Sequence, residues 1–569
     1  MKNTEVAQIF RNIAKILEIK GENVFRIRAY ERAAQNIEGL PNAIESFVKL
    51  DKLKEIPGIG NDLAERIKEY YRTGRIKIFE ELKKSIPEGL LDLLNIPSIG
   101  PKTAKLLYEK IKIKNISDLE RAIKKNKLDG IFGIKEKTIE NMLKGIEIVK
   151  RGRERMTIAQ ATLVAEEFVG ALKELPEVKR IAAAGSLRRQ KETVRDIDIL
   201  VVSDKPQKVM RALTQLPSVK GIQAEGKTKA SVRTKEDVQV DCRVVEAKSF
   251  GAALLYFTGS KNFNIKIRQI AIKKGLKVNE YGVFKGSAFI CGTTEDEIFR
   301  TLGMAYIPPE LRENSGEIEL AKKFNLPKLI ELKDIKGDLH AHSTYSDGGN
   351  SIAEMAAAAK DLGYSYIAIT DHSQSLKVAN GLTPQELKKK KREIDTLNKK
   401  LKNFRVLYGT EADIDSDGNI DYDNGILKEF DIVVGAIHTG FKQSREQLTK
   451  RIVRACKNKY VNIIAHPTGK LWGSRESYDL DFEEVLKAAR DTNTCLEINA
   501  FPNRLDLNDQ HCRQAKEAGV KISIGTDSHE AVQLEAMKFG IAVARRGWLE
   551  REDVINTLPV DALLKAVKK

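Results

Sequence analysis

The sequence predicts a multidomain chain with an all-α N-terminal region, a mixed α/β centre and a C-terminal (β/α) barrel. Three observations support this fold class. Apolar residues recur at spacings of three and four over residues 1–150, short alternating strands begin near residue 157, and strand-like runs alternate with helical ones after residue 336. At 569 residues, the chain is also too long to fold around one hydrophobic core.

The N-terminal region is expected to be a string of short helices separated by glycine and proline. The segments IPGIGNDLAERI (56–67) and IPSIGPKTAKLL (96–107) each place a glycine turn before a helix start. Gly58, Gly60 and Gly100 let the backbone come close to an anion, so the amide groups of each new helix suit a DNA phosphate. Both segments resemble the helix-hairpin-helix motif, although one copy alone would also suit an ordinary helical turn. A third candidate, around Gly133, is weaker.

The α/β centre contains the run GSLRRQKETVRDIDILVV at residues 185–202. Alternate side chains of a strand share one face, so Asp196 and Asp198 would point the same way. The later run VQVDCRVV supplies Asp241, and we expect its strand to lie beside the first. Three carboxylates converging on Mg²⁺ or Mn²⁺ would lower the pKa of a primer 3′-hydroxyl and neutralise charge on a transferring phosphoryl group.

Residues suited to a triphosphate precede these carboxylates. Gly185 offers backbone amide groups, Ser186 a hydroxyl, and Arg188 and Arg189 offer guanidinium groups. An isolated pair of aspartates at this spacing usually lies on a protein surface without function. The neighbouring residues favour a catalytic site instead.

Charge is distributed unevenly along the chain. Residues 1–300 contain 58 Lys and Arg against 40 Asp and Glu, whereas residues 301–569 contain 40 of each, so the whole net charge of +18 lies in the first part. This asymmetry indicates that the first part binds a polyanion, with solubility as the alternative explanation. Five scattered cysteines, and the lack of a signal peptide or a long apolar stretch, suggest a cytoplasmic protein without a membrane partner.

Histidine is absent from the first 339 residues and is then concentrated in the expected barrel. The active sites of such barrels lie at the carboxyl ends of the strands. A lone histidine is more often structural than a ligand, but six of the seven histidines here follow expected strands. Such a set suits Zn²⁺ or Mn²⁺, and nine ligands suffice for three ions. The nine candidate ligands are His340, His342, Asp347, His372, Glu411, His438, His466, Asp527 and His529.

The first 313 residues resemble the family X DNA polymerases, the group of DNA polymerase beta. The resemblance rests on GSLRR, DIDILV, Asp241, YFTGS (256–260), FNIKIRQIA (263–271) and KVNEYGVF (277–284), which occur in this order. It implies a nucleotidyltransferase palm and thumb, in which Asp196, Asp198 and Asp241 bind the catalytic metals. It also implies that Ser186 and Arg189 contact the triphosphate, that Tyr256, Phe257 and Gly259 pack on the deoxyribose, and that Asn264 and Arg268 border the nascent pair and the template. Without the resemblance, Tyr256 and Phe257 would suit core aromatics.

Two positions depart from the family pattern. The lysine that the family uses to form a Schiff base with a 5′-deoxyribose phosphate is Arg66 here, and a guanidinium is almost never deprotonated. We therefore expect weak or absent lyase activity by this route. The family's arginine two residues before the third aspartate is Gln239, which is expected to loosen the coupling between closure and metal binding.

Residues 336–569 resemble the polymerase and histidinol phosphatase (PHP) domain, a distorted (β/α)7 barrel, and all nine positions of that family's metal pattern are filled. Such a cluster generates hydroxide near neutral pH and hydrolyses phosphodiesters. Lys470 or Arg475 would suit the phosphate, although either also suits a solvated surface charge. The resemblance implies one ion bound by His340, His342, Glu411 and Asp527, a second by Glu411, His438 and His466, and a third by Asp347, His372 and His529.

Three other features of the barrel are expected to be structural. DIDSDGNIDYDN (413–424) matches the start of a calcium-binding EF-hand loop, but Asn424 stands where a bidentate glutamate is required, so we expect a strand, a turn and a strand. KKKKRE (388–393) is expected on an exposed helix face. His511 lies on an expected helix, away from the strand ends.

These features predict a repair-type DNA polymerase that fills gaps and whose PHP domain is a 3′–5′ exonuclease that also cuts at abasic sites. In one alternative the PHP domain is structural, and in another the chain is a small-molecule phosphatase with a DNA tether. The expected partners are gapped or primer–template DNA and dNTPs, and the expected state is a monomer. The expected domains are an N-terminal lyase-like helical domain (1–85), fingers with a helix-hairpin-helix (86–150), palm (151–255), thumb (256–313), linker (314–335) and PHP barrel (336–569).

Overall fold

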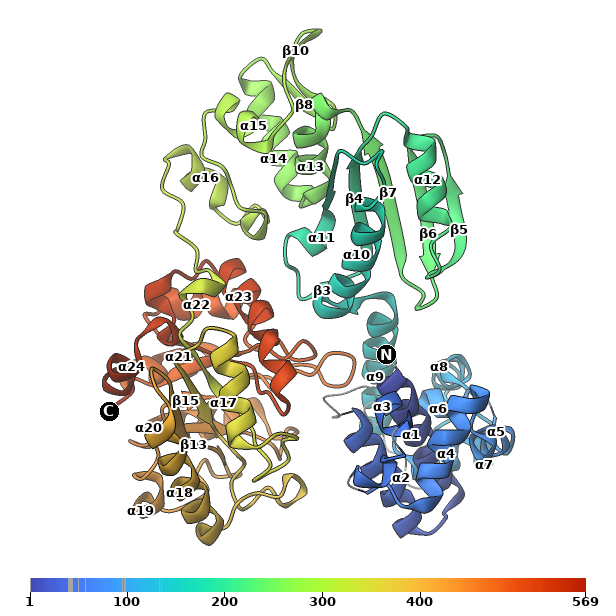
Figure 1. Cartoon of the computed structure of the whole chain (residues 1–569), viewed down its shortest axis with the longest axis vertical. Helices are drawn as coiled ribbons and strands as arrows, with labels where there is room; N and C mark the ends of the chain where they lie inside the picture. Colours follow the sequence, from blue (N-terminus) through green and yellow to red (C-terminus); the bar gives the residue numbers. More distant parts are fainter. Residues whose placement is uncertain are drawn as a thin grey trace.

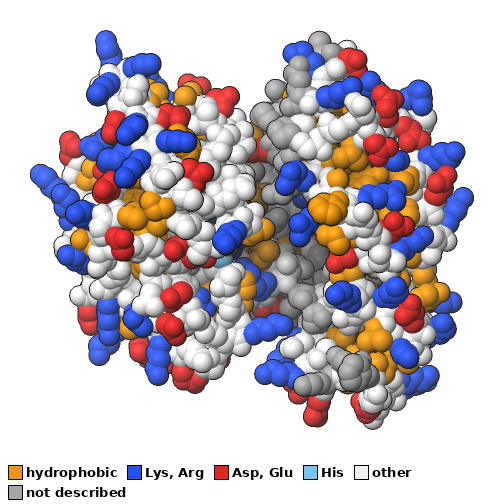
Figure 2. All heavy atoms as spheres, turned by 90° about the horizontal axis from the view of Figure 1, so that it is seen from below, with side chains coloured by type: hydrophobic (Ala, Val, Ile, Leu, Met, Phe, Trp, Pro, Cys, Tyr) orange, Lys and Arg blue, Asp and Glu red, His pale blue; other side chains and the backbone are white. Residues whose placement is uncertain are grey.

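The computed structural model describes residues 2–38, 44–49, 51–56, 58–87, 89–94, 96, 99–131, 134 and 136–569, so Gly133 lies outside the described residues. The N-terminal helices and the C-terminal barrel form the lower half of Figure 1, with the palm and the thumb above them. Seen from below, these two lower parts are separated by a hollow that has Lys and Arg side chains on both rims (Figure 2). None of the described helices has both the length and the apolar content needed to span a bilayer.

The N-terminal helices form two apolar cores, one built from residues 6–82 and the other mainly from residues 86–149. α4 begins directly after Gly60 and α7 directly after Gly100, as the two glycine turns predict. Gly58 has a φ of 77°, in the left-handed region that glycine adopts without strain. The helices are α1 (Lys2–Lys20), α2 (Val24–Glu38), α3 (Ile44–Lys49), η1 (Leu53–Glu55), α4 (Asn61–Thr73), α5 (Lys77–Lys84), α6 (Leu90–Leu93), α7 (Pro101–Ile111), α8 (Ile116–Lys124) and α9 (Glu136–Glu154).

The palm is a five-stranded sheet in the order β2-β4-β7-β6-β5, with a separate pair formed by β1 and β3. Residues of α10 and α12 share a core with the apolar side chains of one sheet face, and α13 packs on the other face. Its elements are β1 (Met156–Thr157), α10 (Ile158–Lys173), β2 (Arg180–Ala183), α11 (Gly185–Arg188), β3 (Thr193–Val194), β4 (Asp196–Val202), α12 (Pro206–Thr214), β5 (Val219–Glu225), β6 (Lys229–Thr234) and β7 (Gln239–Val245).

The thumb contains η2 (Ala247–Ser249), α13 (Phe250–Thr258), α14 (Lys261–Lys273), the antiparallel strands β8 (Lys277–Asn279), β9 (Gly282–Lys285) and β10 (Ala288–Cys291), α15 (Glu295–Thr301) and η3 (Pro309–Leu311). The expected boundary between palm and thumb falls inside α13. The stretch expected to be a linker is folded and contains α16 (Glu317–Lys322) and η4 (Leu332–Asp334). Its polar composition suggested a linker, but Ile318 and Ala321 are buried in the thumb core together with Trp548 of the barrel.

The C-terminal region is a barrel of seven parallel strands that follow one another in sequence order. A parallel bridge between Ala341 and Ser528 links the first strand to the segment after the last. The multidomain fold class predicted from the sequence is therefore confirmed. The strands are β11 (Gly337–Ala341), β12 (Tyr366–Ile369), β13 (Arg405–Asp413), β14 (Ile432–Ala436), β15 (Ile463–Ile464), β16 (Cys495–Asn499) and β17 (Ile522–Gly525).

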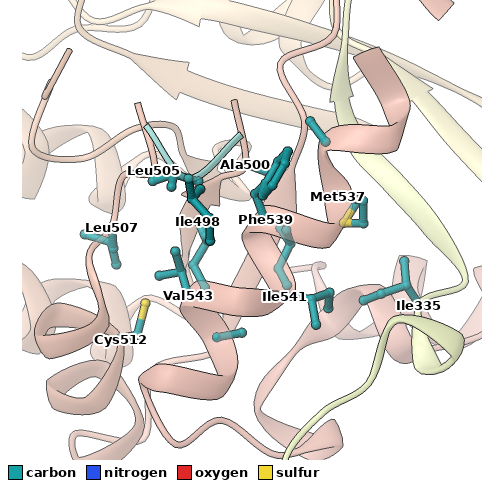
Figure 3. Packing of buried hydrophobic residues seen from close by; sticks show 14 of the residues in the cluster. Ile335, Ile498, Ala500, Leu505, Leu507, Cys512, Met537, Phe539, Ile541 and Val543 are labelled. Atoms are coloured by element: carbon teal, nitrogen blue, oxygen red, sulfur yellow. The ribbon is translucent and has the colours of Figure 1, made fainter. Parts of the chain in front are cut away.

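Helices surround this barrel, and one of them also reaches the polymerase-like half. α23 packs its apolar side chains, including Phe539 and Val543, against Ile498, Ala500 and Leu505 of the barrel (Figure 3). The helices are α17 (Ile352–Asp361), η5 (Lys377–Ala379), α18 (Pro384–Lys400), α19 (Asn424–Leu427), α20 (Arg445–Lys457), α21 (Phe482–Asp491), α22 (Asp509–Glu517), η6 (Ala531–Ala536), α23 (Met537–Arg546), η7 (Arg551–Asp553), η8 (Ile555–Thr557) and α24 (Val560–Ala566).

Two expectations about the barrel can be compared with these elements. In the segment that resembles an EF-hand, Ile414 and Ile420 form an antiparallel bridge, and the Asp415 carboxylate accepts bonds from backbone amides of its own turn. The expected exposed face at 388–393 is wrong for Lys390. This lysine is fully buried, because its ammonium pairs with Asp371 and donates to the carbonyl oxygens of Ile369 and Gly409.

Two candidate metal centres

The first candidate centre lies on two neighbouring strands of the palm sheet. β4 and β7 run parallel with Asp198 opposite Asp241, and Asp196 lies two residues before Asp198 on the same face. Ile197 and Ile199, on the opposite face, are buried in the palm core. The expected pairing of these two strands is therefore confirmed.

Negative charges accumulate on this face of the sheet. Burial, followed by the charges of Asp196 and Asp241, raises the pKa of Asp198 to about 7. The backbone also approaches closely here, because a Cβ added to Gly185 would lie 2.5 Å from an oxygen of Asp198. Gln239, the departure noted in the sequence, donates from Nε2 to Asp241 Oδ2 over 3.0 Å.

These carboxylates have the donor chemistry of a magnesium or manganese site. Oxygen ligands are what such cations prefer, and a cation would relieve the repulsion that raises the Asp198 pKa. The three side chains are nevertheless not as tightly gathered as those of the barrel. Among the described residues, the groups of possible ligands whose atoms all lie within 4.8 Å of one another belong to the barrel alone.

The two arginines before the carboxylates have different surroundings. Arg188 forms a fork with Glu295, with distances of 2.8 and 2.7 Å, so its guanidinium is committed to a buried ion pair. Arg189 donates from Nε to Glu313 over 3.1 Å and from Nη1 to the carbonyl oxygen of Thr258. Arg189 therefore contacts the turn that ends α13, whereas Ser186 is half-buried on α11.

The side chains expected around the nucleotide lie on α13 and α14. Asn264 donates from Nδ2 to the carbonyl oxygen of Tyr256 over 2.7 Å, which ties the two helices together. Arg268 lies one turn further along α14 and is exposed. A cavity of about 550 Å³ opens between palm and thumb and is lined by Arg243 and Phe257 among others. Because Arg243 lies two residues after Asp241 on β7, this cavity is on the carboxylate face of the sheet.

The second candidate centre lies at the carboxyl ends of the barrel strands, where all nine expected ligands meet. Glu411, on β13, is at its middle. One carboxylate oxygen lies 3.1 Å from His466 Nε2 and 3.3 Å from His438 Nε2, and the other lies 2.9 Å from His372 Nδ1. His340 and His342 approach the same carboxylate from β11 and the residue just after it.

The remaining ligands divide into compact groups around this carboxylate. Asp527 lies 3.2 Å from His342 Nε2, and Asp347 lies 3.4 Å from His529 Nε2. Three groups of side chains lie close enough together to bind one ion each. They are His340, His342 and Asp527; His342, Asp347, His372 and His529; and His372, Glu411 and His438. The expected sets differ from these groups at three points: the structure leaves Glu411 out of the first group, adds His342 to the Asp347 group, and places His372 instead of His466 with Glu411 and His438.

The chemistry of the donors fits transition-metal ions. Buried polar atoms without a hydrogen-bond partner include His340 Nε2, His342 Nε2, Asp347 Oδ1 and Glu411 Oε2, all of which face the cluster. Such atoms cost free energy unless a ligand satisfies them. Burial, followed by the charges of His529 and His372, lowers the pKa of His342 to about 4, which keeps its imidazole neutral for metal binding.

Carboxylates behind the cluster orient its imidazoles, and the sequence interpretation missed them. Glu497, on β16, accepts from His340 Nδ1 over 2.7 Å and from the backbone amide of His466 over 2.8 Å. Asp413 pairs with His438 Nδ1. These bonds direct the Nε2 atoms toward the centre. The available signal was a carboxylate inside each of two mainly apolar strands: Asp413, two residues after Glu411 in RVLYGTEAD, and Glu497 in CLEINA.

The cations near the barrel centre differ from those expected. Lys470 pairs with Glu192 of the palm over 2.7 Å, and Arg475 stacks 3.8 Å from the centre of the Phe441 ring. Arg504, which the sequence did not single out, lies 3.5 Å from Asp527. His511, on α22, packs against the ring of Phe482 on α21, away from the ligands.

Comparisons with known proteins match separate stretches of the chain. Family models match a helix-hairpin-helix domain over residues 1–76, a SAM-like helix-hairpin-helix tandem over 90–147, the DNA polymerase beta thumb over 253–313 and the PHP domain over 338–501. A probable phosphatase of Thermoanaerobacter sp. (strain X514) is 32% identical over 39% of this chain and 89% of its own length. A probable phosphatase of Shewanella sediminis (strain HAW-EB3) is 30% identical over 41% of this chain and 93% of its own length.

The fold and the family matches together place this chain in a class of proteins that are similar to DNA polymerase beta and also carry a PHP domain. The DNA polymerase/3′-5′ exonuclease PolX of Bacillus subtilis (strain 168) is 41% identical over 572 residues, which cover 99% of this chain and 100% of that protein. The chain therefore belongs to the PolX family of family X DNA polymerases with a PHP domain. The two resemblances seen in the sequence are confirmed.

Proposed function

We propose that this chain is a DNA polymerase that fills gaps and also degrades DNA from the 3′ end in its barrel. The observation that carries the polymerase half is the register that sets Asp198 opposite Asp241, with Asp196 on the same face. The 3′–5′ exonuclease half rests on the nine ligands gathered around Glu411. Both halves agree with the full-length relative.

In the palm, Asp196, Asp198 and Asp241 would hold Mg²⁺ or Mn²⁺, which when bound supplies charge neutralisation and acidifies the primer 3′-hydroxyl. Ser186 and Arg189 would hold the triphosphate of an incoming dNTP, and Gly185 lets the backbone lie close beside it. The turn at Gly259 would pack on the deoxyribose. Its backbone is kept in place by the bond from Arg189 to Thr258 and by the Asn264 bond to Tyr256.

Template and duplex contacts would come from elsewhere in the chain. Arg268, exposed on α14, would border the template. The two glycine turns, at Gly58 and Gly60 and at Gly100, would contact DNA phosphates. A Cβ added to Gly60 or Gly100 would meet no atom within 4 Å, so there is room for a phosphate close to the backbone. The net charge of the first 300 residues and the basic rims in Figure 2 support this DNA contact.

In the barrel, the nine ligands would hold three Zn²⁺ or Mn²⁺ ions, which when bound supply a hydroxide near neutral pH. The chain's own part is to keep the imidazole of His342 neutral and to fix the orientation of the His340 and His438 rings through Glu497 and Asp413. Burial also excludes water from the carboxylate of Glu411. The same hydrolysis would act on a 3′ terminus and at abasic sites. The completeness of the ligand set argues against a barrel that is only structural.

Three finer points belong to the same proposal. Arg66 forms a fork with Asp62 and would not serve as the lyase nucleophile. The chain would act as a monomer on gapped or primer–template DNA. All five cysteines are free, which suits a reducing cytoplasm.

Separate substitutions test the two activities. Asp196→Ala is expected to abolish nucleotide addition to a labelled primer while leaving its degradation with Mn²⁺ unchanged. His342→Ala is expected to do the reverse. Primer extension by Asp196→Ala/Asp198→Ala would overturn the polymerase assignment, and unchanged degradation by His342→Ala would make the barrel structural.

A further inference from the structure

Palm, thumb and barrel meet at a seam beside the arginine assigned to the triphosphate. Glu313, just after η3, accepts from Arg189 Nε over 3.1 Å. The same Glu313 oxygen accepts from Nη1 of Arg546, at the end of α23, also over 3.1 Å. One carboxylate oxygen thus joins a palm arginine to a barrel arginine.

Arg546 also contacts the main chain of the polymerase half. Its Nη1 donates to the carbonyl oxygen of Arg189 over 2.8 Å and to that of Glu310 over 3.2 Å. On the barrel side, its Nη2 is bonded to Asp509 of α22. Only 4% of the Arg546 side chain is exposed, so this guanidinium is a fixed part of the seam.

The helix that carries Arg546 is itself rigidly held. Met537, Phe539 and Val543 of α23 are buried in the barrel core (Figure 3). Just beyond the helix, Trp548 is buried in the core of the thumb. The position of the Arg546 guanidinium is therefore set by the packed interiors of two domains.

The contacts of Arg189 leave one of its nitrogens available. Nε is bonded to Glu313 and Nη1 to Thr258, and within the described part of the chain Nη2 has no hydrogen-bond partner. An arginine whose fork is held on one side presents its remaining donor in a defined direction. Glu313 would also compete with a phosphate for Arg189, but Arg546 and Lys191 share its charge.

We propose that Arg546 of the barrel is a positioning residue for nucleotide binding in the palm, acting through Glu313 and the main chain of Arg189. This inference rests on the proposed polymerase function and adds that dNTP affinity depends on the barrel through this contact. Without Arg546, the Glu313 carboxylate can rotate, and it pairs with the Arg189 guanidinium alone. Both changes weaken the binding of a triphosphate by Arg189.

The test is steady-state primer extension by the full chain with Arg546→Ala. We expect KM for dNTP to rise about tenfold, the scale of one hydrogen bond to a charged group, while kcat stays close to wild type. The matched control is Arg545→Ala. Arg545 is the preceding residue of α23 and also bridges to the polymerase half, through Glu310 and the carbonyl oxygen of Ile330, but it does not bond to Glu313 or Arg189. The Arg545→Ala variant should therefore have the same KM for dNTP as the wild type.

A double-mutant cycle separates positioning from a general loss of structure. In a Glu313→Gln background, Arg546→Ala should raise KM less than it does in the wild type, because only its hydrogen bond to the Arg189 carbonyl oxygen then remains to be lost. Exonuclease activity of Arg546→Ala should equal that of the wild type. Should this variant lose both activities, Asp509→Asn tests the same contact, with a rise in KM expected and exonuclease retained.

The outcomes distinguish this inference from the function on which it rests. A wild-type chain that does not extend primers would overturn the polymerase assignment. If the wild type extends primers and Arg546→Ala has the KM of wild type, or if Arg545→Ala raises KM equally, the positioning role is refuted.

Discussion

Gly185→Ala tests whether the position of Asp198 controls nucleotide addition. Gly185 has a φ of 65°, which an alanine adopts only at a cost of about 1 kcal/mol or more. More importantly, the new Cβ would lie 2.5 Å from Asp198 Oδ2. Ordinary contact begins at 3.4 Å, so the carboxylate oxygen must move by 0.9 Å (3.4 − 2.5).

The size of the effect follows from that displacement. Because the contact is with the end of a side chain, the fold can adapt, but Asp198 then no longer faces Asp241 as it does in the wild type. A misplacement of about 1 Å in a catalytic arrangement costs about 100-fold in rate. We therefore expect the single-turnover rate of primer extension to fall about 100-fold, with exonuclease activity unchanged.

Gly170→Ala is the matched control. Gly170 lies on α10 of the same domain, and a Cβ there would meet no atom within 4 Å. This variant should extend primers at the wild-type rate and be slightly more stable, because alanine favours a helix more than glycine does. If Gly185→Ala extends primers within a factor of about three of Gly170→Ala, the displacement argument is refuted.

Two further predictions concern buried carboxylates. Glu497→Gln should weaken metal retention by the barrel about 10- to 100-fold, because Glu497 orients His340 and His466. The metal content after dialysis against graded chelator measures this, with Glu483→Gln, at an exposed position, as the control. Equal metal retention by the two variants would contradict the prediction. The pKa of Glu295, which burial alone would raise, is lowered to about 2 by Arg188 and Arg312. Because the pKa of Glu295 is lower in the folded state than in the unfolded state, this group stabilises the fold at pH values above 4.5, its ordinary pKa. This stability is lost as the pH falls toward 2, so the free energy of unfolding of the wild type should fall by about 3 kcal/mol through this group. Thermal unfolding between pH 6 and pH 2 should show a weaker acid dependence for Glu295→Gln than for wild type, and equal dependence would contradict the assignment.

Much of this molecule could be predicted from local sequence because its functional side chains follow regular elements. The barrel ligands end parallel strands, and such ends meet at one edge, so the clustering of His342, His372 and His438 follows from periodicity alone. The alternation in DIDILVV likewise separates Asp196 and Asp198 from the apolar face that packs in the core.

Other features depend on contacts that local sequence does not encode. Lys390 lies in a run of lysines typical of an exposed face, and its burial depends on Asp371, 19 residues earlier in the loop after β12, and on two strand carbonyl oxygens. Arg546 and Arg189 are 357 residues apart, and neither run of sequence indicates the other. Glu497 looks like an isolated charge in a strand until the barrel brings it behind His340.

The interior shared by the thumb, the connecting segment and Trp548 bears on how this protein can be divided. Cutting the chain before the barrel would remove the Trp548 indole from the apolar core of the thumb and leave a void in that core. A truncated polymerase fragment would therefore inherit a defect unrelated to its chemistry, so fragments should be judged against a version in which that void has been refilled.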